Sequence, residues 1–221
     1  MYHYQKGSRQ TRSALAWGLI VLGLAGLLAA WLLHSRSQPT APLNKPSAVH
    51  IDAVPSSTKP SPQQVASYVV ASDLPKYLSI PAIGIDKARV IQLGLLRNNQ
   101  IASPPNIYDA GWYKGSARPG ASGAMFIYGH VSSWTAGGLF QNLHKLKSGD
   151  QIVITRGNDT TVTYQVVSSR IYPQDHVDMN AVLSPVDPLR PGLNLMTCTG
   201  HVIKGTSEFD ERLVVFSKLQ S

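Results

Sequence analysis

The sequence predicts a mainly β domain that follows one apolar helix and a polar linker. Residues 14–33 contain no charged side chain, residues 34–74 are rich in proline and polar side chains, and residues 75–221 alternate short apolar runs with turn residues. Short runs rich in Val, Ile, Thr and Tyr, separated by Gly, Pro, Asn and Asp, are typical of strands. A domain of this length with few helical periods forms one β-barrel or β-sandwich with short helices on its connections.

Residues 14–33 predict a transmembrane helix. Twenty helical residues span about 30 Å, the thickness of the hydrocarbon core. Trp17 and Trp31 lie near the ends of the segment, and the tail 1–13 is basic without any acidic residue. Such a tail stays in the cytoplasm, so the rest of the chain is expected outside the cell membrane. The alternative is a cleavable signal peptide, but the run is long for one and no Ala-x-Ala-like site is obvious.

Residues 34–74 predict an extracytoplasmic tether. Six prolines lie among polar residues in this segment, and such a composition cannot bury enough apolar surface to offset the entropy lost on folding. Within it, Ser61 followed by Pro62 and Gln64 predicts the start of a short helix, with Ser61 as its N-cap. That helix either packs Val65 and Tyr68 on the domain or forms transiently in the linker.

Seven strands are expected in the domain that spans residues 75–221. Gly157, Asn158 and Asp159 provide a hairpin signal between two of them, and a short helix is expected around residues 139–146. The expected strands are 77–80, 88–92, 124–128, 151–155, 161–168, 193–197 and 213–218.

The distribution of charge argues against a nucleic-acid partner. The formal net charge of +8 divides evenly, because residues 1–74 carry six Lys and Arg against two Asp, and residues 75–221 carry fourteen against ten Asp and Glu. No basic run with interleaved aromatic side chains is present, as a nucleic-acid footprint would need. The mild excess is compatible with a domain that works beside anionic lipid and wall polymers.

Cys198 is the candidate nucleophile. It is the only cysteine of the chain and directly follows an expected strand. In an exported protein a single cysteine cannot form an intramolecular disulfide. A thiol is mostly protonated at neutral pH, and acyl transfer needs a group that moves protons to and from the amines.

His130 and Arg212 are the best candidates to serve this thiol. His130 ends the expected strand 124–128 through Gly129, and Arg212 opens the last strand. A guanidinium stays charged and suits the stabilisation of an oxyanion. Taken alone, His130 would more often be an ordinary strand-end residue, and Arg212 a surface partner of Asp210 or Glu211. The competing histidines are His144, His176 and His201.

Five motifs in order make the chain resemble the sortases, the membrane-anchored cysteine transpeptidases of Gram-positive-type cell surfaces. The resemblance covers residues 75–219. The motifs are Leu78-Ser79-Ile80-Pro81-Ala82-Ile83-Gly84-Ile85, Tyr128-Gly129-His130, Phe140 and Leu143 before Leu146-Lys147-Ser148-Gly149-Asp150, Leu195-Met196-Thr197-Cys198 and Arg212-Leu213-Val214-Val215.

One position departs from the usual sortase signature, because Asn194 stands where the family commonly has threonine. Gly111-Trp112-Tyr113 with Arg118-Pro119-Gly120 is most similar to class F, with class D or E as alternatives.

The resemblance implies a closed sortase-type β-barrel and an acyl-transfer mechanism. Cys198 attacks the carbonyl between Thr and Gly of a Leu-Pro-x-Thr-Gly-like sorting signal on a secreted protein. Arg212 holds the substrate and the oxyanion. His130 protonates the departing glycine and then activates an incoming amine, either from a wall precursor such as lipid II or from a pilin lysine.

Further expectations concern substrate binding, loops and cofactors. Tyr128, Met196 and Thr197 are expected to contact the substrate, and residues 173–191 to shape the signal-binding groove, while residues 199–211 are expected to form a mobile loop. No cofactor is expected. Structural calcium is not expected either, because Ca²⁺ sites use clustered oxygen ligands and the aspartates here are scattered, namely Asp109, Asp175, Asp178 and Asp187.

Two other classes of function remain as alternatives. In a non-catalytic adhesion or scaffold domain, Cys198 would be an inert core thiol that resists alkylation. Another cysteine-dependent wall hydrolase fits the order of residues less well, since papain-like amidases place the cysteine before the histidine and L,D-transpeptidases place histidine two residues before it. His-x-x-x-His spacings typical of metal enzymes are absent from the sequence.

Overall fold

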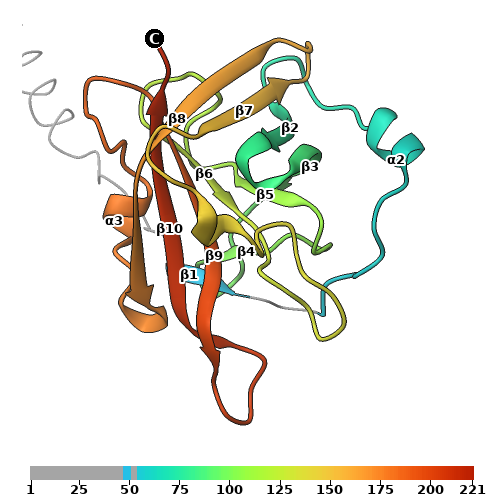
Figure 1. Cartoon of the computed structure of the whole chain (residues 1–221), viewed down its shortest axis with the longest axis vertical. Helices are drawn as coiled ribbons and strands as arrows, with labels where there is room; N and C mark the ends of the chain where they lie inside the picture. Colours follow the sequence, from blue (N-terminus) through green and yellow to red (C-terminus); the bar gives the residue numbers. More distant parts are fainter. Residues whose placement is uncertain (1–46, 51–53) are drawn as a thin grey trace, which may run out of the picture. The chain divides into compact units, whose positions relative to one another are not determined.

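Eight strands close into a barrel in the computed structural model, which describes residues 47–50 and 54–221 (Figure 1). The predicted tail 1–13, the transmembrane helix 14–33 and the first part of the tether lie outside these residues. No helix among the described residues is long and apolar enough to cross a membrane. In their order around the barrel the strands are β10 (Phe209–Leu219), β8 (Thr161–Pro173), β7 (Gln151–Arg156), β2 (Pro75–Ile80), β3 (Ile85–Leu93), β5 (Ala110–Tyr113), β6 (Ala124–Tyr128) and β9 (Gly192–Val202).

The remaining elements are short and lie on the connections. β1 (Ser47–His50) pairs in parallel with β4 (Gln100–Ala102) in a separate two-stranded sheet. The helical elements are α2 (Pro62–Ala66), η1 (Pro81–Ile83), η2 (Leu143–Lys145), η3 (Gln174–His176) and α3 (Met179–Val182).

All seven strands expected from the sequence are present, with most of them longer than expected. The sequence did not predict β5, which has four fully buried residues and therefore no alternation of polar and apolar side chains. The helix expected around residues 139–146 is a single 3₁₀ turn, η2. The short helix α2 is confirmed, with Ser61 as N-cap and a capping box to Gln64.

Two apolar clusters lie on opposite faces of the barrel wall. The first contains residues from all eight strands, including Leu195 and Leu213, and therefore fills the barrel interior. Successive side chains of a strand point to opposite faces, so their neighbours Met196 and Val214 belong to the second cluster. That cluster lies on the outer face and consists of Leu93, Ile101, Tyr113, Phe126, Tyr128, Tyr172, Val182, Met196, Cys198, Val214 and Phe216. Cys198 is thus placed on the outside of the barrel wall, under the elements that cover it.

Residues 54–74, predicted as the last part of the tether, are hydrogen-bonded to the barrel domain. The hydroxyl of Tyr68 donates to the Val90 carbonyl at 2.7 Å, and that of Tyr77 donates to the Val65 carbonyl at 2.5 Å. Further along, the Leu74 carbonyl accepts from the Gly157 N–H. The prediction that the short helix packs on the domain is therefore confirmed. The prolines of this segment are followed and preceded by residues whose backbone N–H and C=O groups form hydrogen bonds with the barrel domain.

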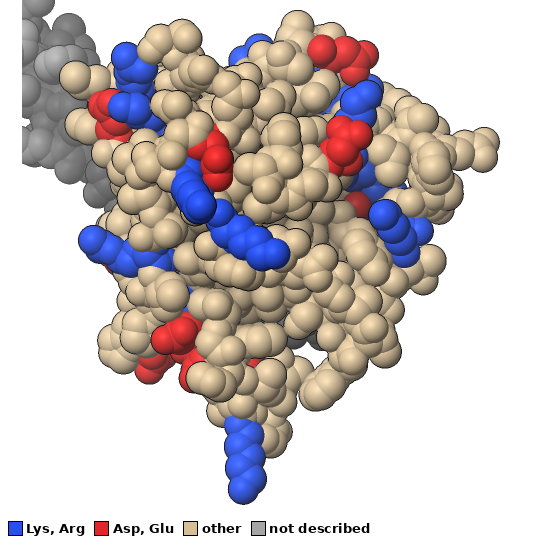
Figure 2. Space-filling view, viewed as in Figure 1, with Lys and Arg blue, Asp and Glu red and all other residues tan. Residues whose placement is uncertain are grey.

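Charged side chains are dispersed over the face seen in Figure 2, where Lys and Arg are interspersed with Asp and Glu on a largely uncharged surface. Among the described residues, Arg118 and Asp73 form an exposed ion pair, and the partly buried Lys76 pairs with the exposed Asp159. Exposed pairs of this kind are typically worth less than about 1 kcal/mol, so they contribute little to the stability of the barrel.

Candidate active site

Three adjacent strands bring the predicted site residues together. β6 and β9 are parallel, with Tyr128 opposite Met196, so the strand ends that precede His130 and Cys198 meet at the same edge. β9 and β10 are antiparallel, and Arg212 lies directly opposite Cys198. Directly opposed residues on one face of an antiparallel pair have Cβ atoms about 5 Å apart. The register of these strands therefore places a thiol, an imidazole and a guanidinium on one edge of the barrel.

Cys198 is buried beside the hydroxyl of Tyr128. The thiol sulfur Sγ lies 3.1 Å from Tyr128 Oη, and only 6% of the cysteine surface is exposed. Burial, followed by the neighbouring Cys198, raises the pKa of Tyr128 well above its usual value. Because Tyr128 keeps its proton at neutral pH, its hydroxyl can donate a hydrogen bond to the sulfur.

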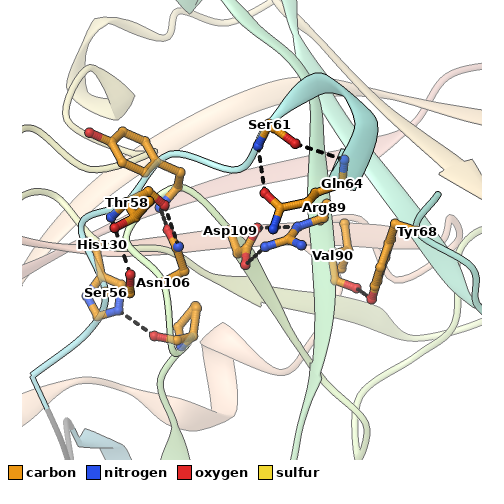
Figure 3. Close-up of polar contacts among 12 residues, drawn as sticks. Ser56, Thr58, Ser61, Gln64, Tyr68, Arg89, Val90, Asn106, Asp109 and His130 are labelled. Carbon is orange, nitrogen blue, oxygen red and sulfur yellow. Dashed lines mark hydrogen bonds and ion pairs between the residues drawn. The ribbon is translucent and has the colours of Figure 1, made fainter. Parts of the chain in front are cut away.

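His130 is held by a backbone carbonyl. Its Nε2 lies 2.8 Å from the carbonyl oxygen of Pro104 (Figure 3). The His130 ring meets the ring of Tyr128 edge-on, with centroids 5.8 Å apart. A carbonyl can only accept, so Nε2 carries a proton and Nδ1 is free to accept one in the neutral ring. Burial lowers the pKa of His130, and the Pro104 carbonyl partly offsets this effect. The histidine is therefore neutral at pH 7.

Arg212 has a buried donor that no described residue uses. Its Nη1 donates to the carbonyls of Phe209 and Glu211 at 2.8 and 2.9 Å, while Nε has no hydrogen-bond partner among the described residues although Arg212 is only 4% exposed. No ion pair joins it to Asp210 or Glu211 in that part of the chain. A buried donor without a partner costs about 1–3 kcal/mol, a cost that an acceptor on a bound ligand removes.

Tyr172 provides a second unused group next to Arg212. It lies opposite Arg212 across the β8–β10 pair, so Tyr172, Arg212 and Cys198 form a row across three strands. The Tyr172 hydroxyl is buried without a partner among the residues described. Sequence reasoning missed this residue because the expected strand ended at residue 168, whereas β8 continues to Pro173.

The Tyr128-Gly129-His130 motif has a steric and a hydrogen-bonding basis. A Cβ at Gly129 would lie 2.5 Å from the ring of Phe140, so the aromatic ring requires glycine there. The Thr197 hydroxyl donates to the Gly129 carbonyl at 2.8 Å, and the Gly129 N–H donates to the Met196 carbonyl at 3.1 Å. These bonds fix the end of β6 to β9. Thr197 and Met196, expected to contact substrate, are both buried in this structure, and their substrate contacts stay a prediction.

The other candidate histidines lie away from this constellation or are exposed. His144 is exposed on η2, and His176 is exposed and bonded to Asp175. The His201 side chain is 95% exposed. His201 lies in β9, which continues to Val202, so the expectation that residues 199–211 form one mobile loop was wrong. Only residues 203–208 connect β9 to β10, because cross-strand pairs continue to Val202 and Phe209.

Residues 173–191 cover the outer face beside the site. Val177, Met179 and Leu183 from this segment pack against the second cluster. Asn194, which stands where sortases commonly have threonine, ties the segment to β9 because its Nδ2 donates to the carbonyls of Val182 and Ser184 at 2.8 and 2.9 Å. The departure from the signature therefore has a structural role in this chain.

No three His, Cys, Asp or Glu side chains cluster closely enough to hold a metal ion in the described parts of the chain. Asp109 forms an ion pair with Arg89 at 2.8 Å, Asp175 contacts His176, and Asp178 caps α3. The side chains gathered at the site supply a thiol, an imidazole, a guanidinium and phenolic hydroxyls.

A closed β-barrel with a buried thiol, imidazole and guanidinium on adjoining strands defines a cysteine-dependent acyl-transfer enzyme. Residues 78–220 match the family model of the sortase domain. The chain therefore belongs to the sortase family of cysteine transpeptidases.

Solved structures show the same fold. The chain is similar to Sortase A from Corynebacterium diphtheriae, with 24% identity and a TM-score of 0.51 over 67% of this chain and 61% of that one. For the lid mutant of that enzyme the identity is 25% and the TM-score is 0.50, over 72% of this chain and 76% of the mutant. For the pilus-related Sortase C of Group B Streptococcus the identity is 23% and the TM-score is 0.51, over 72% of each chain. A comparison with curated protein sequences found no match.

Proposed function

We propose that this chain cleaves a Leu-Pro-x-Thr-Gly-like sorting signal between Thr and Gly and transfers the threonyl acyl group to an amine. The observation that supports the proposal most strongly is that Arg212, whose buried Nε has no partner among the described residues, lies directly opposite Cys198 on the paired strand. An oxyanion forms next to the attacked carbon, which is where this donor is needed.

The first half-reaction forms a thioester. The sulfur of Cys198 attacks the threonyl carbonyl carbon, and neutral His130 accepts the thiol proton. The Nε–H of Arg212 donates to the oxyanion. When the tetrahedral intermediate collapses, the C–N bond breaks and the imidazolium of His130 passes its proton to the departing glycine amine. The products are a Cys198 thioester and a peptide that begins with glycine.

The second half-reaction reverses the roles. An incoming amine attacks the thioester carbonyl, and His130 takes the proton that the nitrogen loses. The C–S bond then breaks, the sulfur regains a proton from His130, and a new amide joins the sorted protein to its acceptor. Proton transfer by a positioned group contributes about 10²–10⁴ in rate, so we expect His130→Ala to lose at least a hundredfold.

Substrate entry requires movement of the covering residues. Cys198, His130 and Arg212 are each less than a tenth exposed. Phe209 and the segment 173–191 pack against the cluster that contains Cys198. We propose that this segment moves aside and then forms one wall of the groove for the sorting signal, with Tyr128, Met196 and Thr197 near the bound threonine.

The proposed setting is the outer face of the cell membrane. Residues 14–33 would anchor the chain, the secreted proteins that carry the sorting signal would be its substrates, and the acceptor amine would come from lipid II or a pilin lysine. If so, the chain fractionates with membranes and keeps its N-terminal tail. A mature N-terminus near residue 35 would contradict the anchor and leave the catalytic proposal untouched.

The test is transfer by the purified full chain. The chain is incubated with sorting-signal peptides and with glycine-based and lysine-based amines, and products are identified by mass spectrometry. We expect cleavage, a thioester on Cys198, and an amide product that requires the amine. Cys198→Ala should fold, as judged by circular dichroism, and yield neither product. Turnover by Cys198→Ala contradicts the proposal, because the reaction would then not need the thiol. If wild-type Cys198 forms no thioester with any of the sorting-signal peptides, the proposal is also contradicted, and the non-catalytic alternative is favoured.

A further inference from the structure

Residues 54–58 run beside the loop that precedes β5 and are hydrogen-bonded to it. The Ser56 N–H donates to the Pro105 carbonyl at 2.9 Å, and the Ile107 N–H donates to the Ser56 carbonyl at 3.0 Å. The side chain of Asn106 adds a third link, since its Nδ2 donates to the Thr58 carbonyl at 2.8 Å (Figure 3). We call residues 54–58 the strap.

The loop 104–109 that the strap contacts is the loop that holds His130. The Pro104 carbonyl accepts from His130 Nε2 at 2.8 Å. Three residues further, the Ile107 carbonyl accepts from the Leu139 N–H at 2.7 Å. Leu139 adjoins Phe140, whose N–H donates to the His130 carbonyl at 2.9 Å. The loop is therefore hydrogen-bonded to the strap through Ser56 and Thr58. It is also hydrogen-bonded to the His130 side chain and to Leu139, whose neighbour Phe140 is bonded to the His130 backbone.

Packing leaves Pro104 little freedom of its own. Pro104 is buried, and a Cβ at Gly111 of the adjoining strand β5 would lie 2.9 Å from the Pro104 ring. Glycine at 111 therefore allows the close approach of Pro104 to the barrel wall. Asn106 also fixes the loop internally, because its Oδ1 accepts from the Tyr108 N–H at 2.9 Å.

A fixed acceptor on one imidazole nitrogen determines what the other nitrogen can do. An acceptor at Nε2 keeps the proton of the neutral ring there, leaves Nδ1 as the basic nitrogen, and fixes the ring orientation. In serine proteases a carboxylate has this role toward the catalytic histidine. Here a backbone carbonyl occupies the corresponding position, and its placement depends on the loop and the strap.

We propose that the strap, linked through Asn106 to the loop 104–109, positions His130 for proton transfer by holding the Pro104 carbonyl against Nε2. The proposal rests on the proposed function of His130 in acyl transfer. Asn106 is thus a positioning residue. A chain segment that precedes the barrel takes part in catalysis without touching substrate.

The charged and titratable groups around His130 are few. Tyr128 faces its ring, and Cys198, Arg212 and Glu208 lie near Tyr128 on β9, β10 and their connection. At the far end of the loop, Asp109 is paired with Arg89. Since the Pro104 carbonyl raises the pKa of His130 against the effect of burial, loss of this contact should lower the pKa further.

The experiment compares two asparagine variants of the full chain, labelled with ¹⁵N in histidine. Asn106→Ser keeps an oxygen that can accept from the Tyr108 N–H but loses the donor to Thr58. Asn158→Ser is the matched control, because Asn158 also accepts from the N–H two residues on, at Thr160, but lies in the β7–β8 turn. His130→Gln assigns the His130 signals.

We expect wild-type His130 to carry its proton on Nε2. In Asn106→Ser we expect a mixed tautomer, a lower pKa for His130, and a kcat about tenfold lower at an unchanged KM, since small misplacements of a catalytic group have large effects on rate. Asn158→Ser should match wild type. Ser56→Pro, which removes the strap N–H that donates to Pro105, should repeat the Asn106→Ser result and serves as the second variant if Asn106→Ser does not fold.

The proposal is overturned if wild-type His130 carries its proton on Nδ1, if the two strap variants keep the wild-type tautomer, pKa and kcat, or if Asn158→Ser loses as much. Failure of the proposed function is distinguishable from these outcomes. If the wild type transfers no sorting peptide, acyl transfer is refuted, whereas the tautomer and the pKa of His130 still decide the role of the strap.

Discussion

Tyr128 Oη is the hydrogen-bond partner that the described residues offer to the Cys198 sulfur. The phenol is held on β6 opposite Met196, and its ring also meets His130. In the proposed mechanism, a hydroxyl in this place would stabilise the thiolate before attack and the same sulfur when it leaves from the thioester. The resemblance to sortases points to Tyr128 as a substrate contact, whereas the geometry favours a direct effect on the nucleophile.

Tyr128→Phe should therefore slow thioester formation by about tenfold and lower the free energy of unfolding by about 1 kcal/mol, the usual worth of one hydrogen bond. Stopped-flow acylation and urea denaturation measure the two effects. Tyr164→Phe is the matched control, because the Tyr164 hydroxyl is also buried and accepts from the Gly120 N–H at 2.7 Å on another part of the barrel. An equal loss of acylation rate in Tyr164→Phe would assign the effect to stability alone.

The buried His130 should make stability depend on pH. Burial lowers the pKa of His130 in the folded chain below its ordinary value of 6.5, so below pH 6.5 the unfolded chain binds the proton more readily. The free energy of unfolding should then fall as the pH is lowered from about 6.5 towards the folded pKa, and level off below it. Urea denaturation between pH 7.5 and 5 measures this, and His130→Gln should remove most of the dependence. If the free energy of unfolding of His130→Gln changes with pH as steeply as that of the wild type, other groups cause the dependence.

At the scale of elements, β9 joins the nucleophile to the covering segment 173–191. Its residues alternate between the barrel interior and the outer cluster, and Asn194 on the outer face is bonded to two carbonyls of that segment. The segment also contributes α3, whose Val182 is fully buried against the barrel. The strand that carries Cys198 is therefore also hydrogen-bonded to the segment that covers the site.

Asn194→Ala should loosen this cover. We expect faster proteolytic cleavage within residues 173–191 and a KM that is several times higher, because the wall of the groove is no longer fixed. The free energy of unfolding should fall by about 1–3 kcal/mol, because two buried carbonyls lose their donor. Ser217→Ala is the control, since it removes a buried bond from Ser217 Oγ to the Leu193 carbonyl without touching the segment. Equal cleavage rates in both variants would show that Asn194 does not hold the cover.

Sequence reasoning identified the strands whose composition is typical of sheets and the three groups with catalytic chemistry. His130, Cys198 and Arg212 could be named because they flank expected strands and because the motifs that contain them resemble those of sortases, whereas position alone favours ordinary roles for His130 and Arg212. Pro104 could not, since its contribution is a backbone carbonyl, and no side-chain pattern marks which carbonyl meets an imidazole. Tyr172 was missed for a different reason: Ser168 and Arg170 occupy the positions where the apolar alternation of Val162, Tyr164 and Val166 would continue, so the pattern that marks β8 fades before its end.

At the scale of the whole molecule, the barrel domain extends further towards the N-terminus than composition indicates. A Pro-rich segment lacks an apolar core of its own, but residues 54–74 need none because the barrel supplies partners for them. Beyond the strap, Ser72 and Leu74 accept from the N–H groups of Asn158 and Gly157, and Asp73 pairs with Arg118.

A fragment of residues 54–221 should therefore unfold at a higher temperature than one of residues 75–221. The shorter fragment loses the hydrogen bonds of Tyr68 and Tyr77 to Val90 and Val65, and the N–H groups of Gly157 and Asn158 lose their acceptors. At about 0.5–1.5 kcal/mol each, these bonds contribute about 3 kcal/mol together, which corresponds to about 10 °C in Tm for a domain of this size. Differential scanning calorimetry measures the Tm of both fragments.

Because the shorter fragment also lacks the strap, its kcat should fall in the same way as that of Asn106→Ser, even at temperatures where it is fully folded. Equal Tm and kcat in the two fragments would show that the domain begins at residue 75, as composition alone indicates.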